Sequence, residues 1–270
     1  MHERISVNSV CFLGATLGET GGYWRELGAQ RVSFVSQSLL REGVEPARAA
    51  LATGRYQVET IAHPFLSGRP LEAREEWHDA RARLMRLIEA SVELGGRSIY
   101  MLTGGHGSLT WEQAAEAFSE AIAPCVARAK QAGIALLIEN ALPLYADIHI
   151  AHSLPDTLAL AEMAGIGVCI DIYGCWAEAG LRASIERTLP RCDLIQVSDY
   201  VYGDRTLPSR AVPGDGAIPL ERILTWILDA GYRGAFDLEL IGPRIDHEGH
   251  LQAARRTGDY LGKVLDSLGA

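Results

Sequence analysis

Residues 134–171, which read IALLIENALPLYADIHIAHSLPDTLALAEMAGIGVCID, contain one complete unit of the pattern that decides the fold. The unit opens with an apolar β-type run at 134–140 and closes with another at 167–172. Between them, the apolar residues of 154–164 recur at the spacing of one helix face. Gly165 follows that stretch, where a left-handed residue after the helix is expected. The stretch therefore predicts a strand, a helix and a second strand.

The same alternation runs along the whole chain. Short β-rich runs are expected at 5–12, 31–36, 57–63, 98–102, 134–140, 167–172, 193–198 and 235–241. Helical spacing is found in 72–94, 110–132, 154–164, 219–230 and 247–268, and three of these stretches are followed by Gly133, Gly165 and Gly231. Continuous apolar strands that alternate with helices indicate a parallel α/β sheet.

Two architectures contain such a sheet. An open doubly wound sheet normally carries a glycine-rich phosphate turn after its first strand, and GATLG at 14–18 matches that turn poorly. Eight alternations suit a closed barrel, and a barrel of about 250 residues is typical. No low-complexity segment or linker divides the 270 residues. We therefore predict an α/β fold, a (β/α)₈ TIM barrel, that spans residues 1–270 as a single domain.

Charge and cysteine content narrow the set of partners. The formal net charge is −9 and Lys and Arg do not cluster, so nucleic acid is not expected to bind. No apolar run approaches the ~18 residues of a membrane span, and the N-terminus lacks the apolar core of a signal peptide. The five cysteines lack CxxC spacing, which favours free thiols in a reducing compartment. A cytoplasmic protein without membrane contact is therefore expected.

Each of the last four predicted strands ends in a polar residue that a buried strand rarely carries. These residues are Glu139, Asp171, Gln196 and Glu239. In a barrel the carboxyl ends of the strands meet at one rim, which holds the active site. Two carboxylates 4 Å apart repel by about 4 kcal/mol at an effective dielectric constant of about 20. No Lys or Arg lies within these strand ends, so a divalent cation is the most economical way to neutralise them.

The ligand types also constrain the ion. All four residues offer oxygen if Gln196 binds through its carbonyl group. Oxygen ligands suit Mn²⁺ or Mg²⁺ better than Zn²⁺, so we expect Mn²⁺, with Mg²⁺, Co²⁺ and Zn²⁺ as the other candidates. Such an ion polarises a substrate carbonyl group and makes the neighbouring C–H bond more acidic. Nearby carboxylates can then move the proton.

The motifs around these residues resemble a known family. They are Glu139-Asn140, Asp171, Gln196-Val-Ser-Asp199, Pro213-Gly-Asp-Gly216 and Glu239. They resemble the xylose-isomerase-like TIM-barrel sugar phosphate isomerase/epimerase superfamily, which includes inosose dehydratase, hydroxypyruvate isomerase, ketose 3-epimerases and endonuclease IV. The resemblance covers most of the chain and implies one divalent metal, often Mn²⁺, on this ligand set. It also implies that Glu139 and Glu239 double as acid/base catalysts.

Two positions depart from the family pattern. Many relatives carry His on the seventh strand where this chain has Gln196, although the dehydratase branch is similar in using Gln. Epimerases tend to carry His three residues after the Asp of the sixth strand, and here that position is Gly174. Both departures favour a lyase over a ketose epimerase.

Other residues on the same rim are candidates for substrate contact, namely His63, His106, Asn140, Trp176, Asp199 and Arg205. His63 and His106 either contact the substrate or are structural histidines. Trp176 either stacks on a substrate ring or covers a helix. Asn140 is expected to orient Glu139, because carboxylate ligands are usually held by hydrogen bonds.

The loop after the seventh strand is rich in Gly and Pro and carries two arginines. Arg205 and Arg210 either bind a carboxylate or phosphate of the substrate or pair with Asp204 and Asp215. On the loop after the fifth strand, His149 and His152 are expected to be exposed to solvent.

The leading hypothesis is a metal-dependent isomerase or epimerase that acts on a small polyhydroxylated or keto substrate. It would remove a proton next to a metal-bound carbonyl group, pass through an enediolate and return the proton elsewhere. The alternative is a lyase or dehydratase that expels a β-leaving group from a keto-sugar, keto-inositol or keto-glycoside. An endonuclease conflicts with the acidic charge, and a non-catalytic barrel leaves the acidic residues without a use. Relatives are often dimers or tetramers, which leaves a homo-oligomer open.

Overall fold

The computed structural model describes residues 1–270 and contains eight parallel strands that close into a barrel. The strands follow one another around the barrel in the order β1, β10, β7, β6, β5, β4, β3, β2. Their bounds are β1 Ile5–Asn8, β2 Arg31–Val35, β3 Gln57–Pro64, β4 Ser98–Leu102, β5 Ala135–Glu139, β6 Gly167–Asp171, β7 Cys192–Val197 and β10 Phe236–Leu238. The predicted (β/α)₈ barrel is thus confirmed. That residues 1–270 form one domain stays a prediction, and the chain groups into two compact units.

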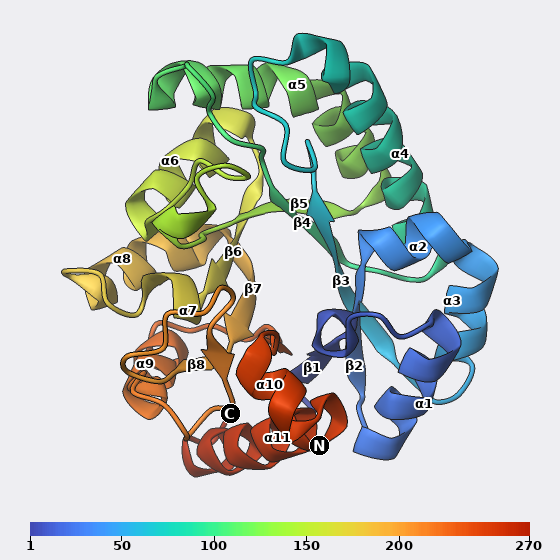
Figure 1. The fold of residues 1–270 in the computed structure, drawn as a ribbon, viewed down its shortest axis with the longest axis vertical. Helices are drawn as coiled ribbons and strands as arrows, with labels where there is room; N and C mark the ends of the chain where they lie inside the picture. The colour runs from blue at the N-terminus through green and yellow to red at the C-terminus, as the bar shows by residue number, and fades with distance from the viewer. The chain divides into compact units, whose positions relative to one another are not determined.

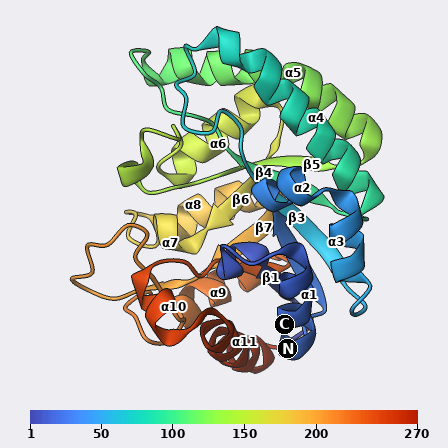
Figure 2. The ribbon, with the colours of Figure 1, turned by 45° about the vertical axis from the view of Figure 1, so that its right-hand side comes forward.

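The first unit joins 1–59 to 194–270. In it β1 lies between β2 and β10, and β10 also pairs with β7, so that Asp237 stands opposite Gln196. Helix α11 packs against β1 and α1. The two chain ends lie close together (Figure 2), and Nε2 of His2 donates a hydrogen bond to the Ala270 carbonyl at 3.1 Å. The helices are α1 Leu17–Leu27, α2 Ser36–Glu42, α3 Val44–Leu51, α9 Leu220–Asp229, α10 Pro243–Glu248 and α11 His250–Ser267.

The second unit comprises 60–193. Here β3, β4, β5 and β6 pair in sequence order, and α4 and α5 lie side by side outside the sheet (Figure 1). The helices are α4 Trp77–Glu93, α5 Trp111–Ala132, α6 Leu154–Ala164, α7 Ile172–Cys175 and α8 Leu181–Thr188. No helix of the structure is both long and apolar enough to span a membrane.

Local sequence signals explain where several helices begin and end. Thr110 caps the first turn of α5 in a capping box with Gln113. Gly133 and Gly165 end α5 and α6 with φ of 72° and 66°, and Gly231 follows α9 with φ of 91°. Glycine adopts these left-handed angles without a steric penalty. The three glycine positions predicted from the sequence are therefore confirmed.

Several helices of the structure, namely α1, α2, α3, α7 and α8, were not predicted, and two further differences concern strands. The first strand was expected to run to residue 12, but it ends at Asn8, whose side chain accepts a hydrogen bond from Val10 N and caps the 3₁₀ helix η1 Ser9–Phe12. After β7 the chain forms an unpredicted two-stranded ribbon of β8 Asp199–Tyr200 and β9 Arg210–Ala211. This ribbon carries residues of the candidate site.

Candidate metal centre

Two of the predicted ligands lie at adjacent strand ends in the second unit. Glu139 is the last residue of β5 and Asp171 the last residue of β6, and both are buried. Asn140 joins the two strand ends, because its amide donates to the Asp171 carbonyl and accepts from the Asp171 N–H, both at 2.9 Å. The amide thus holds the main chain of Asp171. That Asn140 orients the Glu139 side chain and that it contacts the substrate both stay predictions.

The position of Asn140 also explains Gly174. A Cβ atom at Gly174 would lie 2.6 Å from Nδ2 and 2.9 Å from the carbonyl oxygen of Asn140. The Asn140 amide and its two hydrogen bonds to the Asp171 main chain form what we call the strand-end lock. No larger side chain fits at Gly174 unless this lock moves. The absence of a histidine at this position is therefore built into the packing of this chain.

His149 supports Glu139 from the loop after β5. Its Nδ1 accepts the Thr103 N–H at 3.1 Å, so the proton must sit on Nε2, which donates to the Glu139 carbonyl at 2.7 Å. The ring is fully buried, and burial lowers its pKa to about 3. The prediction that His149 is exposed is wrong. The apolar neighbours on either side of it, Ile148 and Ile150, were the available signal of a buried segment.

The other two predicted ligands lie in the first unit. Gln196 is the penultimate residue of β7, and Glu239 follows β10 directly. Both are buried, and the Gln196 amide nitrogen donates a short hydrogen bond to Glu239 Oε2. The amide nitrogen is thus engaged with Glu239, and binding of a metal by Gln196 through Oε1 stays a prediction.

Arg210 lies beside Glu239, although the strand ends alone did not predict it there. Its guanidinium lies 3.1 Å from Glu239 Oε1 and donates to Ser198 Oγ at 2.9 Å, with only 5% of the residue exposed. The four strand ends contain no Lys or Arg, but the ribbon after β7 brings the guanidinium of Arg210 to Glu239. Asp215 is bound by Arg256 at 2.6 Å.

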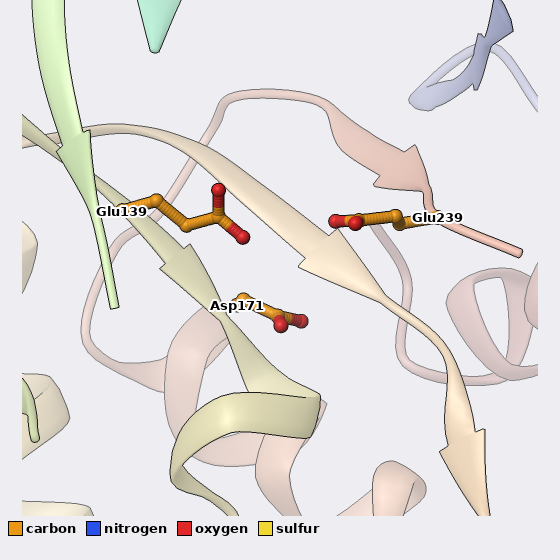
Figure 3. A group of neighbouring side chains, drawn as sticks. All are labelled: Glu139, Asp171 and Glu239. Atoms are coloured by element: carbon orange, nitrogen blue, oxygen red, sulfur yellow. The ribbon is translucent and has the colours of Figure 1, made fainter. Parts of the chain in front are cut away.

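Three carboxylates gather at this site. One oxygen each from Glu139, Asp171 and Glu239 lie within 4.8 Å of one another, and Figure 3 shows the three groups turned toward a common space. All three residues are buried, and Arg210 lies beside Glu239. Hard oxygen donors of this kind suit Mn²⁺ or Mg²⁺, so the residues present fit such an ion.

Asp199 organises the loop beside this centre. Its buried carboxylate accepts hydrogen bonds from the N–H groups of Tyr200, Gly214, Gly216 and Ile218, at 2.8 to 3.0 Å. A Cβ atom on Gly216 would meet this carboxylate at 2.3 Å. The Pro-Gly-Asp-Gly motif therefore wraps around Asp199, and the substrate contact predicted for Asp199 stays a prediction.

The remaining candidates lie in different surroundings. His63, near the end of β3, is buried, and burial together with the nearby Arg83 lowers its pKa to about 3. His106 is exposed and its Nδ1 donates to the Gly107 carbonyl at 3.0 Å. Trp176 is half-buried directly after α7. Arg205 is exposed and donates to the Tyr200 hydroxyl at 2.7 Å. Substrate contact by these four residues stays a prediction.

The chain matches the model of one known protein family. The family model of the xylose isomerase-like TIM barrel matches residues 24–261. The chain belongs to this family. No curated protein matches the chain. The family resemblance derived from the motifs is thus confirmed.

Solved structures show the same fold as this xylose isomerase-like chain. The IOLI protein with a bound zinc atom has a TM-score of 0.82 at 14% identity over 98% of this chain and 99% of that one. The 3-keto-D-glucoside 4-epimerase YcjR from E. coli has 0.78 at 16%, over 96% and 99%. A D-psicose 3-epimerase from Clostridium cellulolyticum H10 has 0.77 at 13%, over 98% of each chain. At these identities the likeness concerns the fold.

Proposed function

We propose that this xylose isomerase-like barrel is a divalent-metal-dependent isomerase or epimerase that acts on a small sugar-like or keto-polyol substrate. The observation that carries the proposal is the group of three buried carboxylates, whose oxygen atoms lie within 4.8 Å of one another. Buried charges are costly unless they are paired or coordinate a metal. The fold neighbours that act on sugars, an epimerase of 3-keto-D-glucoside and one of D-psicose, support the substrate class.

The residues that would hold the ion are Glu139, Asp171, Gln196 and Glu239. Mn²⁺ is the ion we propose, because all four donors are oxygens, although the zinc atom in the IOLI structure keeps Zn²⁺ among the candidates. A bound divalent cation polarises a substrate carbonyl group and so makes the adjacent C–H bond more acidic.

The chain's own residues would move the proton. Glu139 and Glu239 are proposed as the acid/base pair, one removing a proton from the carbon beside the carbonyl and one returning a proton to the resulting enediolate. Arg210 and the Gln196 amide nitrogen fix the orientation of the Glu239 carboxylate. His149 holds the main chain of Glu139. Both glutamates are therefore held in place by residues that do not themselves transfer the proton, as positioned acid/base groups require.

A lyase or dehydratase on the same site is the second candidate. One observation favours it: Asn140 fills the space in which a side chain at Gly174 would lie. The histidine that the epimerase pattern places there to contact the sugar has no room in this chain. A lyase would share the first proton abstraction, after which the carbanion expels a β-leaving group.

The expected setting of the enzyme follows from its composition. All five cysteines are free, which fits the reducing cytoplasm that we propose as its location. The substrate is proposed to be a small molecule. A homo-oligomer is proposed as the assembly on the strength of the family resemblance alone.

A mass-resolved substrate screen tests the reaction class. Metal-loaded protein would be incubated in D₂O with keto-sugars, keto-inositols and 3-keto-glycosides, and each product analysed by mass spectrometry and NMR. An isomerase conserves the mass apart from deuterium incorporated at carbon, whereas a dehydratase product lacks one water. The control variant is Glu75→Gln, at an exposed glutamate of the 3₁₀ segment before α4. Absence of deuterium incorporation and of mass change with every substrate class would refute the proposal.

A further inference from the structure

A second cavity lies in the first unit, beside the loop that follows β8. It has a volume of about 700 Å³ and is bounded by the loop 201–206, by β9 and by α10. We call it the outer pocket. Strand β9 separates it from the candidate centre, because Ala211 lines the outer pocket whereas the neighbouring Arg210 contacts Glu239. A ligand of the outer pocket is therefore distinct from a substrate bound at the centre.

The carboxylate of Asp204 holds one arginine in the wall of this pocket. Its Oδ1 accepts hydrogen bonds from the N–H and the hydroxyl group of Thr206, at 2.9 and 2.7 Å. Its Oδ2 accepts a hydrogen bond from Nε of Arg244 at 2.7 Å. The bonds from Thr206, followed by that from Arg244, lower the pKa of Asp204 to about 2. The carboxylate therefore stays ionised at neutral pH and keeps Arg244 in place.

The main chain of Asp204 holds a second arginine. Nη1 of Arg205 donates to the Asp204 carbonyl at 3.1 Å and to the Tyr200 hydroxyl at 2.7 Å. The same hydroxyl group donates to the Asp204 carbonyl at 2.9 Å, which closes a small ring of hydrogen bonds. Arg205 and Arg244 are thus both bonded to one residue, and both line the outer pocket.

These two guanidinium groups have donors that no protein atom accepts. Nε and Nη2 of Arg205 make no hydrogen bond within the chain, and neither do the two terminal nitrogens of Arg244. The planar fork of an arginine matches a carboxylate or a phosphate, which it binds through two parallel hydrogen bonds. The outer pocket therefore presents two such forks on one wall.

The other carboxylates of the outer pocket are bound by a third arginine. Asp215 and Glu248 line the pocket, and Arg256 donates to Asp215 at 2.6 Å and to both oxygens of Glu248 at 2.9 Å. Neither carboxylate is bonded to Arg205 or Arg244. These two arginines therefore share only the carboxylate of Asp204, and one positive charge on their side of the pocket has no bonded counter-charge.

We infer that the outer pocket binds the phosphate or carboxylate group of a small molecule through the free donors of Arg205 and Arg244. The oxyanion supplies the missing negative charge and accepts paired hydrogen bonds from the two forks. Pockets of roughly 300–1,000 Å³ bind small ligands, so the rest of the molecule fits between the loop 201–206 and α10. The inference does not rest on the proposed function, because the candidate centre lies on the other side of β9.

Anion binding to metal-stripped protein tests the inference, because no metal ion can then hold the anion at the centre. Isothermal titration calorimetry would use two probes, inorganic phosphate and malonate. We expect at least one of them to bind at one site per chain, and the probe that binds identifies the group that the pocket takes. Arg205→Ala and Arg244→Ala should each weaken this binding about ten-fold or more. The matched control is Arg182→Ala, at an exposed arginine of α8, which should leave it unchanged.

Three results would overturn the inference. The first is that neither probe binds to the unchanged protein. The second is that both probes bind to Arg205→Ala and Arg244→Ala as tightly as to the unchanged protein. The third is that binding is lost in Arg210→Met and kept in the other two variants, which would place the anion beside Glu239. Circular dichroism checks that each variant is folded, and Arg205→Gln replaces Arg205→Ala if the alanine variant is not.

Discussion

Glu139 and Glu239 are both proposed to transfer protons, but different residues hold them in place. His149 fixes the main chain of Glu139, whereas Arg210 and Gln196 contact the carboxylate of Glu239. Changing either glutamate to Gln keeps the volume and one carbonyl oxygen while it removes the base. We therefore expect part of the metal to remain bound while turnover falls by roughly 10²–10⁴.

Solvent deuterium exchange at the substrate carbon distinguishes the two glutamates. The variant that lacks the abstracting base should show no exchange, while the other can still exchange from one face. Near-normal rates and exchange in both Glu139→Gln and Glu239→Gln would show that neither residue is the base. His63, which is buried and neutral at neutral pH, would then be the next residue to examine.

Arg210 tests the charge balance of the centre. Removing one partner of a buried ion pair typically costs 3–5 kcal/mol, so Arg210→Met should lower the unfolding free energy of metal-stripped protein by about 3 kcal/mol. The centre would then have lost the positive charge of Arg210 beside Glu239, and added Mn²⁺ should raise Tm more in the variant than in the unchanged protein. Arg210→Lys, which keeps the charge, is the control. An equal Tm shift in all three proteins would show that the charge of Arg210 does not offset the negative charge of the centre.

At the scale of elements, the strand ends of β5 and β6 are locked by Asn140. Gly174→Ala places a Cβ atom 2.6 Å from Nδ2 of Asn140, and such overpacking typically costs 1–3 kcal/mol. In an Asn140→Ala background the cost should shrink, because the amide is gone and only the main-chain contact remains. Urea unfolding of the two single variants and the double variant measures this coupling.

The matched control for the strand-end lock is Gly22→Ala. A Cβ atom at this position of helix α1 meets nothing within 4 Å, so the substitution should not destabilise and is expected to stabilise by about 0.5–1 kcal/mol. Additive effects of Gly174→Ala and Asn140→Ala would show that the two residues are not in contact.

At the scale of elements, the sequence predicted the ends of several strands and helices but neither the place of Arg210 nor the burial of His149. Strand ends were predictable because Glu139 and Asp171 interrupt apolar runs, and helix ends because Gly133 and Gly165 adopt left-handed angles. Arg210 was not assigned to the centre because its partner lies 29 residues away in the sequence, across a ribbon that no apolar pattern marks. His149 was wrongly predicted to be exposed, because it is held by Thr103 and Glu139 at the ends of β4 and β5.

At the scale of the whole molecule, three buried groups make stability depend on pH. Burial lowers the pKa of His63 and His149 to about 3 and raises that of Asp237 to about 7, despite hydrogen bonds to the Asp237 carboxylate from Asn8 and Ser33. The unfolded values are about 6.5 for His and about 3.9 for Asp. Between pH 6.5 and 4 the folded histidines bind fewer protons than the unfolded ones, whereas folded Asp237 binds more.

The signs of these two effects are opposite. Each histidine contributes stability that is present above pH 6.5 and is lost as the pH falls, at about 1.4 kcal/mol per unit. Asp237 contributes stability at low pH that is lost as the pH rises through about 7. In metal-stripped protein, urea unfolding between pH 6.5 and 4.5 should therefore show a flatter slope for His63→Asn and a steeper acid loss for Asp237→Asn. Parallel slopes for all three proteins would contradict these assignments.

The central claim is that Glu139, Asp171, Gln196 and Glu239 hold one divalent cation. Its most direct test is the metal content of the purified protein, measured by inductively coupled plasma mass spectrometry, with and without chelation. We predict about one divalent ion per chain in the unchanged protein and in Glu75→Gln, and a marked loss in Asp171→Asn. Chelation should abolish turnover, and Mn²⁺ should restore it. Full activity in metal-free protein, or metal retained unchanged in Asp171→Asn, would contradict the claim.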